Sequence, residues 1–291
     1  MRKNSRPFSL SVIVRLIKVR LSMMVTFSAL TGYVLSGSNV NVSFLFLFAG
    51  VFLLSAGASV LNQVQERNYD KLMPRTCKRP IPAGEISIGL SVFIALLLIL
   101  SGASLLWQNG WVPAFLGLLN IVFYNLIYTP LKTKSWLAIL PGAIVGGVPP
   151  LIGWTSAGHS LLHPNAIFLF IFVCMWQVPH FWLLMIKYGK EYEQAGFSSI
   201  SKILSELQIR RVVFFWGLIT SLFLLFLPFF GFILHPIMIA SLVLTNLFFI
   251  RQFYTYLFSE RESGAVRKAF ILINMYAMVV FIILAINALV S

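Results

Sequence analysis

Nine long apolar stretches divide the sequence, and they constrain its fold more than any other feature. Each approaches the twenty or so residues that a helix needs to cross a bilayer core roughly 30 Å thick. Runs of this length favour helices, whereas a membrane barrel would show short alternating strands. We therefore predict an all-α membrane protein, a bundle of nine transmembrane helices, at 20–37, 43–65, 86–107, 111–130, 136–157, 165–186, 211–232, 234–256 and 267–289.

The composition excludes an ordinary soluble domain. Only 10% of the residues are charged, against about a quarter in soluble proteins. No long linker or low-complexity tract interrupts the chain, so we predict a single transmembrane domain over 1–291. Residues 1–19 form its cytoplasmic N-terminal segment in this interpretation. We do not expect a signal peptide, because this basic segment leads into a full-length span.

The formal charges lie in alternate connections between the predicted spans. The charged connections hold Arg2, Lys3, Arg6, Arg15, Lys18 and Arg20, then 66–85, Lys132 and Lys134, 187–211, and 251–268. The positive-inside rule places these in the cytoplasm, with the N-terminus inside and the C-terminus outside. We expect a multi-pass protein of the cell (inner) membrane. The Lys and Arg residues that give the net charge of +14 then orient the chain and contact anionic headgroups in the bilayer. We expect no nucleic-acid partner.

Acidic residues recur at helical spacing in "NQVQERNYDKLMPRTCKRPIPAG", residues 62–84. On a helix, Asn62, Glu66 and Asp70 advance about 40° per step and therefore share one face. Carboxylate oxygens at this spacing suit Mg²⁺, which takes further oxygens from water and substrate phosphates. The stretch lies where the second predicted span meets the cytoplasm, so it predicts a metal site at a membrane face.

Cations follow the acids within the same stretch, namely Arg75, Lys78 and Arg79. Arginine matches phosphate geometry in a bidentate way that lysine does not. Acids for a metal and cations for phosphate together describe a diphosphate site, with "RPIPAG" as a rigid turn that holds Arg79. The alternative is a solvated loop with ordinary surface ion pairs. Asn62 favours the site, because a polar amide at the end of a span usually faces the bundle interior.

A second candidate stretch is "WQVPHFWLLMIKYGKEYEQAG" in the sixth predicted span and its loop. His180, Lys187 and Glu191 lie within about 20° of one helical face. His180 is the only histidine predicted inside the membrane, which makes it a functional candidate. The alternative is a neutral histidine hydrogen-bonded to a neighbouring helix. Pro179 weakens the helix directly before it.

The fourth and fifth predicted spans add "FYNLIYTPLKTKSW" and "PGAIVGGVPPLIGW". In the former, Tyr124, Asn125 and Tyr128 form an amphipathic stripe, which is either part of the site or an interfacial tyrosine belt. In the latter, glycines favour close helix packing, and two prolines predict a break in the helix above them. The residues concerned are Gly142, Gly146, Gly147, Pro149 and Pro150.

Together these motifs resemble the UbiA-type intramembrane prenyltransferases, and specifically their protohaem IX farnesyltransferase (haem O synthase) branch. The resemblance is carried, in order, by the acidic stretch, "YTPLK", "GAIVGGVPPLIGW" and "WQVPHFW" followed by "EYEQAGF". It implies transfer of a farnesyl group from farnesyl diphosphate to a vinyl group of haem B, giving haem O and diphosphate. The reaction belongs to haem A/O biosynthesis. The implied cofactor is Mg²⁺, and the implied protein partners are haem A synthase or oxidase assembly proteins.

The resemblance also implies roles for individual residues. Metal ligands would be Asn62, Glu66, Asp70 and Glu191. Diphosphate-binding cations would be Arg75, Arg79, Lys78, Lys187, Lys18 and Arg20. Glu66 stands where many members have aspartate, and Lys190 replaces an acid common beside the Glu191 position, so a second metal is less expected than the first.

The reaction adds expectations for the apolar part of the site. Ionisation of an allylic diphosphate leaves a positive prenyl carbon, which the aromatic faces of Tyr124, Tyr128 or Trp176 would stabilise. His180 would either ligate the haem iron or orient the macrocycle through a hydrogen bond. Two rival functions stay open: a prenyltransferase acting on an aromatic or quinone precursor such as 4-hydroxybenzoate, and a transporter or channel.

Overall fold

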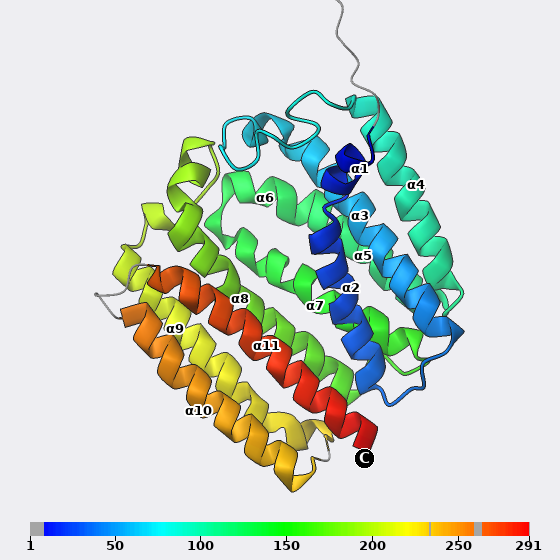
Figure 1. Ribbon diagram of the computed structural model, residues 1–291, viewed down its shortest axis with the longest axis vertical. Helices are drawn as coiled ribbons and strands as arrows, with labels where there is room; N and C mark the ends of the chain where they lie inside the picture. The colour runs from blue at the N-terminus through cyan, green and yellow to red at the C-terminus, as the bar shows by residue number, and fades with distance from the viewer. Residues whose placement is uncertain (1–8, 233, 259–263, 291) are drawn as a thin grey trace, which may run out of the picture.

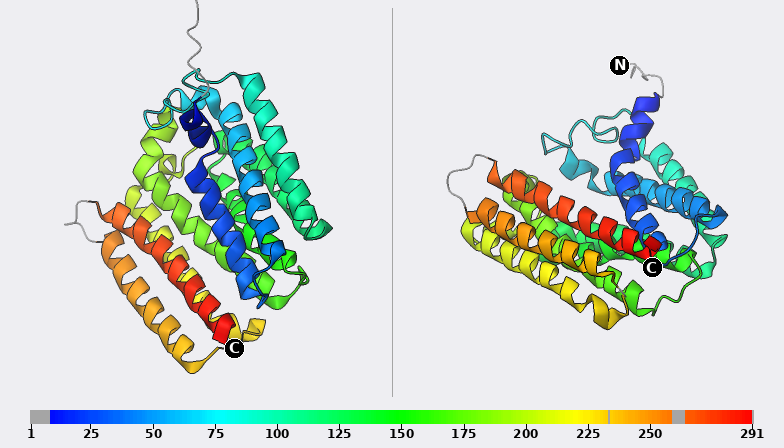
Figure 2. Two further views of the ribbon diagram at one scale, coloured as in Figure 1. Left: turned by 45° about the vertical axis from the view of Figure 1, so that its right-hand side comes forward. Right: turned by 60° about the horizontal axis from the view of Figure 1, so that its bottom comes forward.

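The computed structural model describes residues 9–232, 234–258 and 264–290, which form a bundle of helices (Figures 1 and 2). Arg2, Lys3 and Arg6 of the predicted cytoplasmic set lie outside the described residues. The described elements are α1 Leu10–Leu16, α2 Val19–Leu35, α3 Val42–Asp70, α4 Ile88–Trp107, α5 Trp111–Val122, η1 Phe123–Tyr128, α6 Thr129–Lys134, η2 Trp136–Ala138, α7 Ile139–Ser156, α8 Pro164–Gln194, η3 Ile200–Lys202, α9 Glu206–Phe223, η4 Leu224–Phe230, α10 Pro236–Phe258 and α11 Ala265–Val290.

The all-helical membrane fold is confirmed. Within the described residues, 8 helical segments are long and apolar enough to span a membrane, and α2 is a shorter apolar helix. The chain is therefore an integral membrane protein. The count of nine spans and the sides on which the two ends lie stay predictions.

Helix ends differ from the predicted spans at three places that matter for the site. A short helix, α1, precedes α2 within the segment predicted as an N-terminal extension. The helices α3 and α8 continue to Asp70 and Gln194, past the predicted ends at 65 and 186. An apolar run marks only the part of a helix that lies in the membrane. The helix itself can continue into water as long as its backbone hydrogen bonds continue. The candidate acids therefore stand on rigid helical turns.

The predicted break at Pro149 and Pro150 is wrong, because α7 continues through both residues. Its backbone is pressed against α2: a Cβ atom on Gly32 would lie 2.0 Å from the Pro150 carbonyl oxygen. Similarly, a Cβ atom on Gly153 would lie 1.8 Å from the carbonyl oxygen of Ala29. Packing by neighbouring helices compensates for the backbone donors that proline lacks. The predicted close helix approach at the α7 glycines is confirmed, since a Cβ atom would collide with a neighbouring side chain at Gly142, Gly146 and Gly147.

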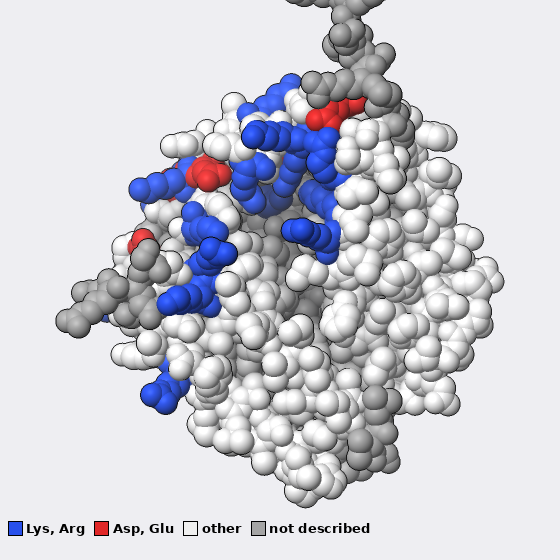
Figure 3. Space-filling view, viewed as in Figure 1, with Lys and Arg blue, Asp and Glu red and all other residues white. Residues whose placement is uncertain are grey.

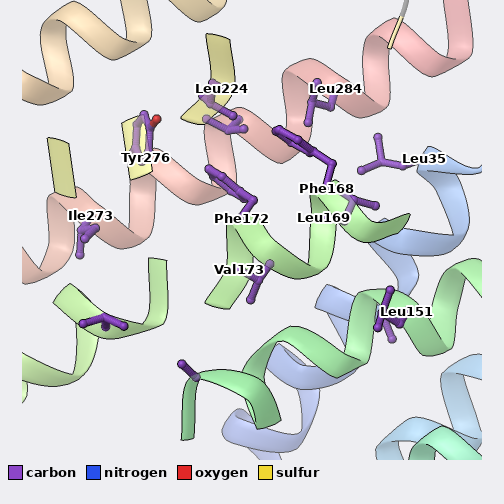
Figure 4. Close-up of a cluster of buried hydrophobic side chains, with 14 of the residues drawn as sticks. Leu35, Leu151, Phe168, Leu169, Phe172, Val173, Leu224, Ile273, Tyr276 and Leu284 are labelled. Carbon is purple, nitrogen blue, oxygen red and sulfur yellow. The ribbon is translucent and has the colours of Figure 1, made fainter. Parts of the chain in front are cut away.

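The apolar core gathers around α8, which packs against α7, α9 and α11. Phe168 and Phe172 of α8 lie among Leu224 of η4 and the α11 side chains Tyr276 and Leu284 (Figure 4). All five side chains are buried. This packing on three sides fixes one half of α8 rigidly. The residues at its other end are thereby held in position for the site.

Candidate active site

Asn62, Glu66 and Asp70 occupy the last turns of α3 and are nearly removed from solvent, with exposed fractions of 2%, 6% and 0%. The predicted common helix is confirmed, because α3 is continuous through all three residues. Buried carboxylates are costly unless cations or hydrogen-bond donors pair with them. The partners of this acidic face therefore define the site.

Each of the three side chains is paired with a cation from a different segment. Lys18 Nζ donates to Asn62 Oδ1 at 3.0 Å. Arg79 Nη1 donates to both oxygens of Asp70, at 2.8 and 2.7 Å. Lys132 forms an ion pair with Glu66. The structure thus brings together the predicted Asn62, Glu66, Asp70, Lys18 and Arg79, and it adds Lys132.

Lys18 reaches the acidic face because the chain breaks between α1 and α2. It is the one described residue other than glycine with a positive φ, 47°, in the left-handed region. Gln63 Nε2 donates to the Leu16 carbonyl at 2.5 Å and so ties the end of α1 to α3. Strained backbone of this kind persists only where its surroundings enforce it, and it is common at functional sites. Burial, and then the neighbouring Arg79 guanidinium, lowers the pKa of Lys18 to about 7.

Arg79 is held by the turns of its own loop, as "RPIPAG" predicts. Thr76 Oγ1 donates to the Asp70 carbonyl at 2.9 Å, and the Arg79 amide donates to the Thr76 carbonyl at 2.9 Å. The Ala83 amide in turn donates to the Arg79 carbonyl at 2.9 Å. These bonds fold the loop back over the end of α3. The guanidinium is therefore fixed beside Asp70 by the local sequence.

The fourth span supplies the opposite wall of the acidic face through η1, a π-helical segment. Gln65 and Asn125 exchange hydrogen bonds, at 2.8 and 3.1 Å. Asn62 Nδ2 donates to Thr129 Oγ1 at 3.3 Å. Single turns of π-helix often mark functional sites. Here η1 presents Asn125 and the start of α6 presents Thr129 to α3, and these hydrogen bonds hold the segments together.

An aromatic ladder continues from this wall into the bundle. Tyr124 and Tyr128 stack with their ring centroids 5.7 Å apart, and Phe181 of α8 follows at 6.1 Å from Tyr128. Lys132 Nζ lies over the Tyr128 ring at 4.9 Å. The stripe of Tyr124 and Tyr128 therefore lies beside the acidic face, through the contact of Lys132 with Tyr128, and its role in the site stays a prediction. Lys132 follows Tyr128 by four residues, so it lies on the same helical face and could have been included from the sequence. The sequence interpretation used it only for the placement of charged loops in the cytoplasm.

Arg75 joins the first motif to α8. Its guanidinium donates to the Tyr192 hydroxyl and lies over the rings of Tyr188 and Tyr192, at 5.0 and 4.9 Å. The next residue of interest on α8, Glu191, has a buried Oε2 atom with no hydrogen-bond partner among the described residues. Within the described part of the chain, no hydrogen bond or ion pair joins Glu191 to the acidic face, so its role as a metal ligand stays a prediction.

His180 lies on the side of α8 that faces α11. Its Nδ1 atom is 3.1 Å from Asn274 Oδ1, and its ring lies 4.9 Å from each of Trp176 and Phe270. Trp176 Nε1 donates to the Ile273 carbonyl at 2.9 Å. The alternative of a histidine hydrogen-bonded to a neighbouring helix is therefore met in this structure. Asn274 was missed from the sequence, because an asparagine inside an apolar run carries no spacing signal.

The remaining predicted cations lie outside the acidic face. Lys187 Nζ lies over the Tyr188 ring at 4.8 Å and lines a small cavity together with Arg267 of α11. Arg20 and Lys78 are exposed. Their proposed part in diphosphate binding stays a prediction. Lys and Arg side chains gather along the rim of a hollow in the face shown in Figure 3, while much of the rest of that face is uncharged.

The acidic face fits the magnesium that the resemblance implies. Its donors are carboxylate and amide oxygens, the ligands that Mg²⁺ prefers. Within the described ranges, no group of three His, Cys, Asp or Glu side chains converges to hold a metal by itself. Asn62 and oxygens of a bound diphosphate would have to complete the ligand set of Glu66 and Asp70. The excess of cations around these acids suits a polyanionic ligand.

Comparisons with known proteins agree with this chemistry. Residues 25–282 match the model of the UbiA prenyltransferase family. A protoheme IX farnesyltransferase of Geobacter sulfurreducens is 38% identical over 62% of this chain and 67% of its own. A protoheme IX farnesyltransferase of Oleidesulfovibrio alaskensis is 34% identical over 75% of this chain and 77% of its own.

Solved structures share the fold at low sequence identity. A digeranylgeranylglyceryl phosphate synthase structure superposes with a TM-score of 0.79 at 17% identity, covering 97% of this chain and 99% of its own. A UbiA homologue from Archaeoglobus fulgidus, bound to GPP and Mg²⁺, superposes with a TM-score of 0.66 at 12% identity. This second match covers 94% of the chain and 99% of its own.

Proposed function

We propose, because this chain belongs to the UbiA prenyltransferase family, that it transfers a farnesyl group from farnesyl diphosphate to a vinyl group of haem B. The products are haem O and diphosphate. The observation that carries the proposal is the buried acidic face of α3, on which Asn62, Glu66 and Asp70 each bind a cation from another segment. The haem specificity rests on relatives that are named protoheme IX farnesyltransferase.

The acidic face is the diphosphate end of the reaction. Asn62, Glu66 and Asp70 would hold Mg²⁺, which supplies neutralisation of the charge that develops on the leaving oxygens. A UbiA homologue has been solved with Mg²⁺ and a prenyl diphosphate bound, which supports this cofactor. Lys18 and Lys132 already point their ammonium groups at this face and are positioned to donate to phosphate oxygens.

Arginines add directed donors to the same end. Arg79 is fixed beside Asp70 and offers further N–H groups to a bound phosphate. The Arg75 guanidinium lies over two tyrosine rings near the end of α8 and so links the loop after α3 to α8. Preorganised donors of this kind act without reorganising during the reaction, which is the largest source of electrostatic catalysis.

The aromatic ladder is placed to stabilise the prenyl carbocation. The C–O bond to diphosphate breaks with its electron pair going to oxygen, and positive charge remains on the allylic carbon. Tyr124 stacks on Tyr128, which contacts both Phe181 and the Lys132 ammonium group of the acidic face, and the π-faces of the two rings would attract that charge. The vinyl carbon of haem then forms the new C–C bond. Water adds to the resulting cation and loses a proton, which leaves the hydroxyl group of haem O.

The orientation of the chain follows from the charges. We place the acidic face and its cations at the cytoplasmic side of the cell membrane, with the N-terminus inside, because the charged connections meet at that end of the helices. Farnesyl diphosphate would then present its diphosphate to the cytoplasm and its apolar chain to the bundle. Access of labelling reagents to single cysteines introduced in the loops would test this orientation.

Product analysis tests the function. Membranes that contain the protein receive haem B, farnesyl diphosphate and Mg²⁺, and the haems are separated by chromatography and identified by mass spectrometry. We expect a haem O peak that disappears with a chelator and returns with added Mg²⁺. Prenylation of 4-hydroxybenzoate in place of haem would keep the family and overturn the acceptor. Turnover that survives the chelator would overturn the magnesium assignment.

A further inference from the structure

An amide side chain of α8 lies near the middle of a membrane span. Gln177 stands about halfway along the span predicted at 165–186, within the continuous helix α8. The side chain is half-buried, and within the described residues it forms no hydrogen bond with another group. A polar group in apolar surroundings is costly without a hydrogen-bond partner, and polar residues inside membrane spans commonly mark functional sites. The amide therefore has its full capacity to bind a ligand or a water molecule.

The backbone of α7 leaves room for this amide at Gly146. A Cβ atom on Gly146 would lie 2.2 Å from Gln177 Nε2 and 2.7 Å from its Cδ atom. The amide thus fills the volume that a side chain at Gly146 would need. One helical turn earlier on α7, Gly142 gives the same room to the rings of Tyr128 and Phe181. The two glycines therefore place the Gln177 amide one turn beyond the aromatic ladder, farther from the acidic face.

A second amide borders the same segment of α7. Asn120 of α5 donates through Nδ2 to the Val145 carbonyl at 3.2 Å. Its Oδ1 atom is buried and has no hydrogen-bond partner among the described residues. Val145 directly precedes Gly146, so two amides with incomplete hydrogen bonding reach one short segment of α7, from α5 and from α8. Buried polar atoms of this kind are usually satisfied by internal water.

The proposed reaction consumes a water molecule inside this apolar bundle. When the terminal vinyl carbon bonds to the farnesyl carbon, positive charge moves to the vinyl carbon attached to the macrocycle. Addition of water forms a C–O bond there, and loss of a proton from the added water to solvent gives the alcohol. Alternatively, the neighbouring carbon loses a proton to solvent, and its C–H electron pair forms a C=C bond. This alkene is lighter than the alcohol by one water molecule, so the product reports whether water is held beside the cation.

We propose that Gln177 is a positioning residue that holds the water molecule that adds to the prenylated haem. The inference rests on the proposed function, which makes haem B the acceptor and haem O the product. Gln177 Oε1 accepts a hydrogen bond from the water, which leaves a lone pair of the water oxygen free to bond to the cation. The neutral amide takes up no proton, so the proton of the added water passes to solvent. Gly146 is required because it gives the amide its place beside α7.

The ratio of alkene to alcohol product tests this role. The purified full chain in nanodiscs receives haem B, farnesyl diphosphate and Mg²⁺, and the haems are quantified by chromatography and mass spectrometry. We expect the wild type to give mainly the alcohol. Gln177→Leu should raise the alkene-to-alcohol ratio about tenfold, the factor for loss of one hydrogen bond. Gln177→Glu keeps polar oxygen atoms on a side chain of the same length and should stay within about threefold of the wild-type ratio. A wild-type ratio in Gln177→Leu overturns the proposal.

Two further variants separate the position of the amide from the packing of the helices. Gly146→Ala keeps the amide but removes its room, because the new Cβ atom meets the end of the flexible Gln177 side chain. It should raise the ratio in the same direction, by about threefold or more. Cys174→Ala, one turn away on α8 and packed against Gly147, is the matched control and should keep the wild-type ratio even if turnover falls. An equal rise in Cys174→Ala would overturn the role of the amide.

A second measurement separates this inference from the function on which it rests, because it needs no turnover. A crystal structure of the wild type grown in lipidic mesophase should show an ordered water molecule within hydrogen-bond distance of the Gln177 amide, and Gln177→Leu should lose it. Haem O production by the wild type, together with an unaltered product ratio in Gln177→Leu, would reject the role of Gln177 and keep the reaction. Absence of prenylated haem, together with an ordered water at Gln177, would reject the reaction and with it this role, and would leave a structural water site.

Discussion

The two ends of the site differ in how their buried polar side chains are paired. On the α3 side, Glu66 and Asp70 are charged and each holds a cation. On the α8–α11 side, His180 and Asn274 are hydrogen-bonded to each other among aromatic rings. The first arrangement suits a ligand whose charge grows during the reaction, because preorganised charged groups stabilise charge that develops in the transition state. The second suits recognition of a planar apolar acceptor. The difference predicts that variants on the two sides will separate kinetically.

The largest effect is expected for Asp70→Ala. Its carboxylate both anchors Arg79 and would ligate the metal, so we expect turnover to fall about 10³-fold or more. The control is Glu85→Gln, which removes an acid of the same loop that pairs with Arg15 at the surface. Steady-state kinetics and the thermal stability of the purified protein check the prediction. Turnover within tenfold of wild type in Asp70→Ala would remove Asp70 from the chemistry.

Lys132→Met is expected to lower turnover about 10²-fold and to raise the KM for farnesyl diphosphate. Lys132 is the partner of Glu66, and its loss leaves a buried carboxylate unpaired. Lys134→Met, two residues along α6 and exposed, is the matched control and should be near wild type. Equal kinetics of the two variants would show that Lys132 only orients the chain.

His180→Ala should act on the acceptor alone. We expect kcat/KM for haem B to fall about tenfold to a hundredfold, as for loss of an oriented ligand. The KM for farnesyl diphosphate should change by less than about twofold, because His180 touches α11 and not the acidic face. Varying each substrate at saturation of the other gives the two constants. A change confined to the KM for farnesyl diphosphate would contradict the division of the site into two ends.

The smallest effect is expected for Arg20→Gln. Arg20 is exposed, and exposed charges contribute little to binding. We expect its kinetic constants to stay within about twofold of wild type, whereas Lys18→Gln should raise the KM for farnesyl diphosphate about tenfold. Kinetics of the two variants under identical conditions provide the measurement. A larger loss in Arg20→Gln than in Lys18→Gln would return Arg20 to the diphosphate site.

Much of the candidate site could be predicted because its main signals are local. The common face of Asn62, Glu66 and Asp70 follows from helical periodicity alone, and the fold of the loop around Arg79 follows from its own turn residues. The break predicted at Pro149 and Pro150 failed for the opposite reason. Whether a proline interrupts a helix depends on the packing around it, and α2 lies directly against this part of α7.

By itself, the sequence determined the membrane-spanning helical character of the chain, the family and the acidic face, because hydropathy and periodicity are properties of short segments. The tertiary structure alone decided which distant groups meet. It brought Lys18 and Lys132 to Asn62 and Glu66 of α3. It also joined His180 of α8 to Asn274 of α11, and it set Lys187 and Arg267 around one small cavity. The physical reason is that such pairings depend on the register and close packing of whole helices, which no short segment encodes.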